Sequence, residues 1–237
     1  MSDQRPNSLD PIEVPPPAES SIFRISSRTA TILMIFTVAF TALMAATYFA
    51  TKPAIEESVR AEKMKLIGDV LPKSAYDNDL LADAVALPAI AALGLDDPST
   101  VYRARRAGAP VALVIEAAAP DGYSGRIGLL LAISAEGRLL AMRVTQHKET
   151  PGLGDYIDPK KDKNKTSPWI SQFDSKSLAE VNAEQWKVKK DGGVFDAHVG
   201  ATISARAVTN ASGRALTWVD ARREKLFALP AAGKFVE

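Results

Sequence analysis

The feature that most constrains this chain is an uncharged apolar stretch near its N-terminus. Residues 29–51 read TATILMIFTVAFTALMAATYFAT and contain no Asp, Glu, Lys or Arg. As an α-helix at about 1.5 Å per residue, the stretch extends about 35 Å, which exceeds a hydrocarbon core of about 30 Å. It is apolar on all faces, which is typical of a helix surrounded by lipid. The stretch therefore predicts one transmembrane helix.

A cleaved signal peptide is the alternative for this stretch. It fits less well, because the apolar part is longer than the usual h-region of about 7–15 residues and begins only after residue 28. Residues 1–28 contain five prolines and are expected to form a short disordered cytoplasmic tail. Basic residues flank both ends of the stretch, so charge bias does not choose an orientation. The short tail and the absence of cysteine favour a C-terminal domain outside the cytoplasm.

Composition excludes several classes of function. The chain has 29 basic and 28 acidic residues among 237, and this net charge of +1 argues against nucleic acid as a partner. It has no cysteine and only two histidines, His147 and His198. Disulfides, thiolate-held clusters and cysteine nucleophiles are therefore excluded, and a metal site is not expected. No P-loop, Gly-x-Gly-x-x-Gly or Gly-x-Ser-x-Gly motif occurs, so neither nucleotide-fingerprint binding nor serine hydrolysis is expected.

The remaining residues have the patterning of one α+β domain. A charged helix is expected over 56–71, and a second helical piece over 80–93, broken at Pro88. Apolar residues at every fourth position predict a final helix over 203–219. Strands are expected over 100–106, 110–117, 126–134 and 138–147, with a hairpin turn at Gly137. Because no long helices separate these strands, we expect an antiparallel sheet with flanking helices.

The start of the final helix carries the most informative string, Asp196 to Thr202 (DAHVGAT). Thr202 stands at the expected helix start, two residues after Gly200. A hydroxyl there is an N-cap candidate. The same place suits a phosphate, because free backbone N–H groups and the helix dipole both favour an anion. By frequency alone, the N-cap would be the first choice.

The surrounding string, residues 192–208 (GGVFDAHVGATISARAV), closely resembles the flavin-attachment region of the G subunit of the Rnf electron-transport complex. In that family, also called the ion-translocating oxidoreductase complex, the pattern is Asp, two or three residues, Ser or Thr, Gly, Ala, Thr. A flavin transferase esterifies the final threonine to the phosphate of FMN. The resemblance implies that Thr202 is the acceptor, within a motif that includes Asp196, Gly200 and Ala201. Val199 departs from the pattern, because the family has a hydroxyl residue there.

Three further segments resemble the same family, in the family's order. They are Asp121–Gly125 (DGYSG), His147–Asp155 (HKETPGLGD) and 169–173 (WISQF). For 147–155 alone, a strand ending in a Pro-Gly turn would be the first choice. A flavin ring needs an apolar slot with a few polar groups at its edge. The resemblance implies packing from Tyr123, Leu153 and Trp169, hydrogen bonds from Glu149 and Thr150, and close backbone approach at Gly152, with Ser124 beside them.

The resemblance implies a single-pass, covalent-FMN flavoprotein subunit that carries electrons in an ion-translocating ferredoxin:NAD oxidoreductase. We expect a tail over 1–28, a transmembrane helix over 29–51, a helical membrane-proximal segment over 52–98 and an FMN-binding domain over 99–237. The domain is expected on the periplasmic side of a bacterial inner membrane. Expected partners are the other subunits, a flavin transferase and membrane lipid, and no turnover is expected from the isolated chain, with no catalytic residue of its own.

Two alternatives stay open. The first is the related C subunit of the sodium-pumping NADH:quinone reductase, which has the same chemistry. The second is a single-span scaffold or binding protein of the same fold without a flavin, and Val199 is the feature that supports it.

Overall fold

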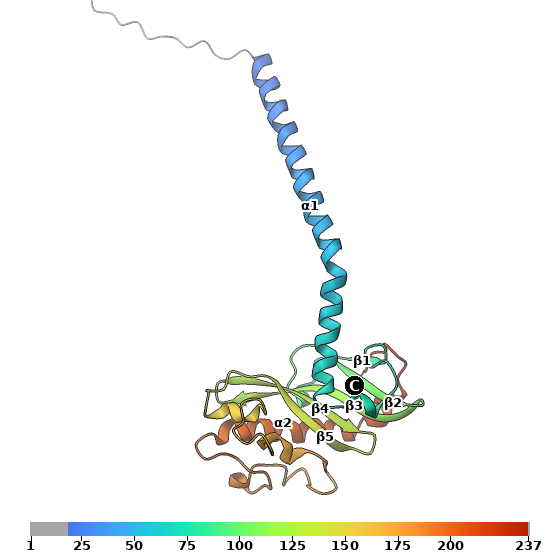
Figure 1. Ribbon diagram of the computed structural model, residues 1–237, viewed down its shortest axis with the longest axis vertical. Coiled ribbons are helices and arrows are strands. Elements are labelled where there is room, and N and C mark those ends of the chain that lie inside the picture. The colour runs from blue at the N-terminus through green and yellow to red at the C-terminus, as the bar shows by residue number, and fades with distance from the viewer. Residues whose placement is uncertain (1–18, 237) are drawn as a thin grey trace, which may run out of the picture. The chain divides into compact units, whose positions relative to one another are not determined.

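The computed structural model describes residues 19–236 (Figure 1). The described chain divides into two compact units, with the boundary between Val59 and Arg60. Helix α1 runs over Glu19–Gly68 without a break and contains Pro53. It includes residues 19–28 of the expected tail and most of the helix expected over 56–71. Residues 1–18 of the expected tail lie outside the described residues.

Helix α1 has the length and composition of a membrane span. Side chains from Phe23 to Val59 are exposed within the chain itself, and the apolar window of this helix is unburied. A helix of this kind can be stable only in surroundings that accept its apolar surface, because leaving large apolar patches in water is costly. The sequence-based expectation of a single N-terminal membrane-spanning helix is consistent with this description.

One six-stranded antiparallel sheet forms the centre of the second unit, and the strands lie side by side in chain order. Its four middle strands confirm the expected antiparallel sheet. The strands are β1 (Ala84–Leu87), β2 (Ser99–Arg106), β3 (Ala109–Gly122), β4 (Gly125–Ser134), β5 (Arg138–Gln146) and β6 (Lys176–Ser177).

The two edge strands differ from the sequence-based expectation. The helical piece expected over 80–93 is wrong: Ala84 to Leu87 pair with β2, and only a 3-10 turn, Ala91–Leu93, follows. Alanine and leucine favour helices, but pairing with β2 buries Val85 and Leu87 and overrides that weak preference. Strand β6 consists of two residues that pair with β5, and no alternating sequence pattern predicts it.

Both faces of the sheet are buried, so the domain has three layers. Alternate residues of β3 and β4 enter two separate cores: Ile115 and Leu129 face one, and Val114 and Leu130 face the other. Helix α2 (Thr202–Asp220) covers the first face, and the last turns of α1 cover the second (Figure 1). This explains why these strands are continuous apolar runs rather than alternating ones.

Small residues let α2 pack closely on the sheet. Ala207, Ala211 and Ala215 recur along its buried face, with Val208 and Val219 beside them. A short helix, α3 (Arg223–Ala228), follows. Four further 3-10 helices complete the domain: Lys73–Ala75, Gly154–Ile157, Trp169–Phe173 and Lys189–Asp191.

Two tight turns connect the central strands. In the β4–β5 turn, Gly137 has φ +85° and donates its N–H to Ser134 O at 3.0 Å, as expected for a glycine in a hairpin turn. In the β3–β4 turn, Gly122 pairs with Gly125, so Tyr123 and Ser124 form a two-residue tip. The Gly-Tyr-Ser-Gly segment is therefore a hairpin tip.

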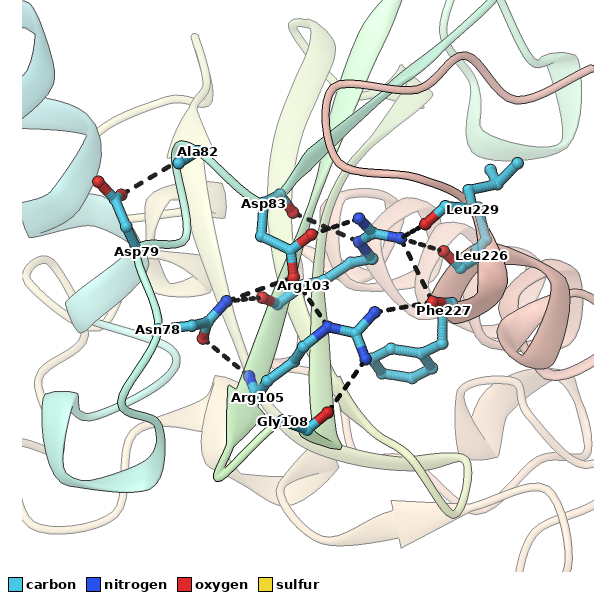
Figure 2. Close-up of polar contacts among 10 residues, drawn as sticks. All are labelled: Asn78, Asp79, Ala82, Asp83, Arg103, Arg105, Gly108, Leu226, Phe227 and Leu229. Carbon is cyan, nitrogen blue, oxygen red and sulfur yellow. Dashed lines mark hydrogen bonds and ion pairs between the residues drawn. The ribbon is translucent and has the colours of Figure 1, made fainter.

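A buried polar network anchors the C-terminal segment to the sheet (Figure 2). Arg103 is 1% exposed, pairs with Asp83 and donates to Leu226 O at 3.1 Å. Arg105 pairs with the second oxygen of Asp83 at 2.9 Å and donates to Phe227 O at 2.7 Å. The two guanidinium groups thus satisfy carbonyls at the end of α3, which otherwise lack partners at a helix C-terminus.

Candidate functional site

Thr202 is the first residue of α2, and the N-cap is Ala201, whose φ is −131°. Thr202 is therefore at the helix start, as expected, but it is not the N-cap, which was the alternative role for its hydroxyl. The chain turns one residue earlier than expected, because Gly200 adopts φ +87°, which glycine tolerates best. The side chain at the N-cap position cannot accept a hydrogen bond, so it leaves the N–H groups of the first turn uncapped.

The backbone groups of Asp196, the motif aspartate, form hydrogen bonds with two side chains. Trp169 Nε1–H donates to Asp196 O at 2.6 Å, and Asp196 N–H donates to Gln172 Oε1 at 2.7 Å. The Asp196 carboxylate points outward and pairs with Lys189 at 2.8 Å. Both partners are exposed, so this ion pair contributes little to stability. Trp169 and Gln172 therefore position the loop before α2.

Tyr156 holds the other end of the same loop. Its hydroxyl accepts the His198 N–H at 3.1 Å and donates to Ala201 O at 3.3 Å. The His198 ring stacks on the phenol with centroids 3.8 Å apart. Burial is the main cause that raises the pKa of Tyr156, so the phenol stays protonated and can donate at neutral pH.

Glu149 joins three segments around the helix start. It is 4% exposed, and one carboxylate oxygen accepts the Ser124 N–H at 3.0 Å. The other oxygen accepts the hydroxyl of Ser204, in the first turn of α2. Its own N–H donates to His147 Nδ1 at 3.1 Å. The β3–β4 tip, the loop over 147–155 and the start of α2 therefore meet at this carboxylate.

Four exposed apolar side chains border this junction. Among residues 60–236, seven large apolar side chains are exposed, and four of them flank Thr202 or a segment tied to Glu149. We call this group the exposed apolar set; it comprises Tyr123, Leu153, Val199 and Ile203. Tyr123 is 68% exposed and Leu153 is 58% exposed. A contiguous apolar surface on a monomeric domain often marks a ligand or partner site, whereas single exposed apolar side chains are common.

The other expected residues fall into different surroundings. Gly152 has φ +76° and open space beside it, whereas Gly154 is buried, and a Cβ there would lie 2.6 Å from Ser204 Oγ. Thr150 O accepts the Leu153 N–H at 3.1 Å and closes the turn. Trp169 is buried against Tyr156, so its ring does not belong to the exposed apolar set.

Arg206 lies one turn after Thr202 but does not face an open site. It makes a bidentate pair with Asp191, with a second contact of 2.8 Å. The hydrogen bond from Arg206 holds the pKa of the Asp191 carboxyl below its usual range. This arginine therefore fixes the 3-10 helix at 189–191 against α2.

Two hollows in the domain lie away from Thr202. One of about 260 Å³ is lined by Lys63, Tyr102, Glu116 and Arg126, among others. Another, of about 610 Å³, lies along the later turns of α2, and its lining includes Trp186 and Trp218. No residue expected to bind a cofactor lines either hollow, so neither of them is the expected flavin site.

Comparison with known proteins identifies the family. Residues 21–70 match the RnfG N-terminal region, and residues 122–217 match the FMN-binding domain. The G subunit of the ion-translocating oxidoreductase complex from Pseudoalteromonas atlantica is 41% identical over 205 residues, covering 86% of this chain and 93% of the relative. A Pseudomonas aeruginosa protein of the same name is 44% identical over 201 residues, covering 85% and 92%.

The chain belongs to the RnfG family, the G subunits of ion-translocating oxidoreductase complexes. A crystal structure of Shewanella oneidensis NqrC is a more distant likeness, with 20% identity and a TM-score of 0.43, covering 68% of this chain and 75% of that chain. As a member of the RnfG family, the chain contains an FMN-binding domain that extends from Gly122 to Thr217. Every residue expected to contact the cofactor lies within these bounds.

The residues present fit an FMN group. The exposed apolar set offers surface for a flat ring, and the uncapped first turn of α2 offers donors for a phosphate. The described residues hold no cluster of three or more His, Cys, Asp or Glu that could bind a metal. The geometry therefore suits a flavin lying on the surface around Thr202.

Sequence reasoning missed the residues that support this surface. Tyr156 bonds the loop before α2, Gln172 bonds Asp196, and Ser204 bonds Glu149. Gln172 and Ser204 lie in segments that resemble the family, but the resemblance implied no role for either of them. The available signal was Ser204, one of three polar residues on the buried face of α2, together with Thr209 and Ser212.

Proposed function

We propose that this chain is a membrane-anchored flavoprotein subunit of an ion-translocating oxidoreductase complex, with FMN joined through its phosphate to the Thr202 hydroxyl. The observation that carries the proposal is the position of Thr202 at the uncapped start of α2, next to the exposed apolar set. Backbone N–H groups there suit a phosphate, and the helix dipole favours its charge. FMN supplies the electron-transfer chemistry when bound, and the protein sets its position and environment.

Attachment requires a flavin transferase and an activated flavin nucleotide. In that step the Thr202 Oγ–phosphorus bond forms, the hydroxyl loses its proton to a base, and the leaving group on phosphorus departs. The product has one FMN added and one water removed. The loop before α2 is accessible to such an enzyme, because Val199 and Gly200 are exposed.

Covalent flavin can be tested on the full chain, co-expressed with a flavin transferase. We expect a fluorescent band under denaturing conditions in the parent and none in Thr202→Ala. Thr217→Ala is the matched control, because Thr217 is exposed on the same helix and should not affect the band. Intact mass of the parent should rise by one FMN less one water.

A dark parent band, in the presence of a transferase shown to be active on another substrate, would refute the covalent linkage. A flavin-free scaffold would then explain the fold better. If Thr202→Ala stays fluorescent, the acceptor is another residue.

The proposed partners are the other subunits of the complex and membrane lipid around α1. Electrons would pass between ferredoxin and NAD through the complex, and the isolated chain would have no turnover. The relatives at about 40% identity carry the name of the G subunit, which supports this assignment over the C subunit of a quinone reductase. Pull-down of an affinity-tagged full chain from solubilised membranes should recover further membrane subunits together with flavin.

We place the second unit in the periplasm of a bacterial inner membrane. The cysteine-free sequence makes this easy to test, because single cysteines can be introduced as labels. A membrane-impermeant maleimide should label Lys163→Cys, in an exposed loop, once the outer membrane is permeabilised. Asn7→Cys should be labelled only after lysis. The reverse pattern would contradict the orientation.

A further inference from the structure

Glu149 is a buried carboxylate with an unusual setting. Within residues 19–236, none of the observed ion pairs involves it, and both of its oxygens are used by a backbone N–H and a hydroxyl. Burying a charged group costs free energy unless hydrogen bonds compensate. The two donors, Ser124 and Ser204, are 25 residues before and 55 residues after it in the chain. The side chain therefore holds together segments that are distant in sequence.

Two glycines lie close to the Glu149 carboxylate. A Cβ on Gly122 would lie 2.9 Å from one carboxylate oxygen, and a Cβ on Gly154 would lie 2.7 Å from the other. Both distances are too short for real contacts, and Gly125 O and Ser204 Oγ lie closer still, so a larger residue at either position would force the junction to shift. The glycines before Tyr123 and after Leu153 thus serve this junction.

The exposed apolar set adjoins the residues that Glu149 holds. Tyr123 is the neighbour of Ser124, Leu153 is the neighbour of Gly154, and Ile203 is the neighbour of Ser204. Thr202 lies two residues before Ser204. Moving the carboxylate would therefore move three apolar side chains relative to the threonine hydroxyl.

From this geometry we infer that Glu149 is a positioning residue, which sets the ring-facing surface relative to Thr202 without touching the ring itself. The inference rests on the proposed function. It replaces the expectation that Glu149 hydrogen-bonds the edge of the flavin, because the carboxylate is buried and both oxygens already have donors.

The first test does not need the flavin. Amide hydrogen exchange is measured on the full chain carrying Thr202→Ala, with Glu149→Ala, Glu149→Gln or Ser204→Ala added. Glutamine keeps an oxygen for the Ser124 N–H and offers an amide that Ser204 Oγ can accept. Glu184→Ala is the control, because Glu184 is exposed.

We expect Glu149→Ala to accelerate exchange of the Ser124 amide and of amides 206–208 together, by about tenfold or more, because both segments lose a buried acceptor. Glu149→Gln should stay close to the parent. If Glu149→Ala accelerates exchange only within 147–155, the carboxylate does not join the segments and the inference is wrong. If that variant does not fold, Ser204→Ala decides: faster exchange at Ser124 supports the inference, and unchanged exchange refutes it.

The second test uses the flavin-loaded chain. The visible circular dichroism of the flavin reports the surroundings of the ring. We expect Glu149→Ala to change this spectrum and Glu149→Gln to restore it, since the geometry is kept without the charge. A changed spectrum in Glu149→Gln, with normal amide protection, would instead indicate direct contact with the ring and overturn the positioning role. A parent chain that takes up no flavin would refute the proposed function, while the exchange result would stand.

Discussion

The Tyr156 phenol holds the end of the loop nearest to α2. Tyr156 bonds both the His198 N–H and the Ala201 carbonyl, and it lies under the His198 ring. Buried hydrogen bonds of this kind contribute about 0.5–1.5 kcal/mol each. The residue therefore stabilises the approach to Thr202, although it lies just outside the segment 147–155 that resembles the family.

Replacing Tyr156 by Phe should lower the free energy of unfolding by about 1–2 kcal/mol at pH 7, because two hydrogen bonds are lost. The raised pKa of Tyr156 means that the folded chain holds this proton more tightly than the unfolded chain. Its contribution is complete below about pH 10 and is lost as pH rises through the raised pKa. Urea unfolding at pH 7 and pH 10.5 should show the gap between parent and variant narrowing. A gap that widens at high pH would contradict this.

Val199 is fully exposed, so its departure from the family pattern concerns recognition rather than folding. We expect Val199→Thr to change the free energy of unfolding by less than about 0.5 kcal/mol. The added hydroxyl should raise the initial rate of flavin incorporation by about 2–10-fold, the equivalent of one hydrogen bond. Time courses of in-gel fluorescence measure this, with Val236→Thr, also exposed, as the control. Equal rates in parent and variant would show that the transferase does not read this position.

At the scale of elements, the backbone of residues 187–195, before α2, is closely packed against itself. Val188 and Phe195 form a bridge, and Phe195 is buried against Phe173 at 4.5 Å. Gly193 lies against the backbone of Lys187, where a Cβ would approach its carbonyl oxygen to 2.0 Å. The glycine at 193 is therefore required by backbone contact and not by flexibility.

Gly193→Ala should lower the free energy of unfolding by about 1–3 kcal/mol or more, because the backbone must shift to admit the methyl group. The shift would also reduce flavin attachment, since Phe195 precedes the motif aspartate. Gly68→Ala is the control, because nothing lies within 4 Å of its Cβ position. Thermal unfolding of both variants tests the comparison, and equal midpoints would contradict the packing argument.

At the scale of the whole domain, the polar network in Figure 2 joins the segment before β1 to the C-terminal segment. Asp83 follows the last turns of α1 and precedes β1, and Arg103 in β2 reaches carbonyls of the C-terminal segment. An arginine that is 1% exposed needs its carboxylate partner, because an uncompensated buried charge is costly. The network therefore stabilises the domain that carries Thr202.

Asp83→Ala should lower the free energy of unfolding by about 3–5 kcal/mol, the usual cost of breaking a buried pair. Asp96→Ala breaks the exposed pair with Arg126, at 3.2 Å, and should cost about 0–1 kcal/mol. Urea unfolding of the flavin-free chain separates the two. A small effect of Asp83→Ala would show that water or another group replaces the carboxylate.

Several elements could be predicted from local patterns of residues alone. The uncharged stretch at 29–51 specified the apolar helix, the apolar runs specified the central strands, and the four-residue spacing after Thr202 specified α2. The family resemblance supplied Thr202 as the expected flavin acceptor, which stays a prediction. Backbone hydrogen bonding and periodic burial within one element leave these marks in neighbouring residues.

The way in which those elements meet depends on contacts between distant parts of the chain. The edge strand at 84–87, the hold of Tyr156 on the loop and the junction at Glu149 link residues that are far apart in the chain. No local pattern records such contacts, because each depends on how separate segments pack. Thr202 became the first residue of α2, and not its cap, for the same reason: Gly200 turns the chain where Tyr156 and the core hold it.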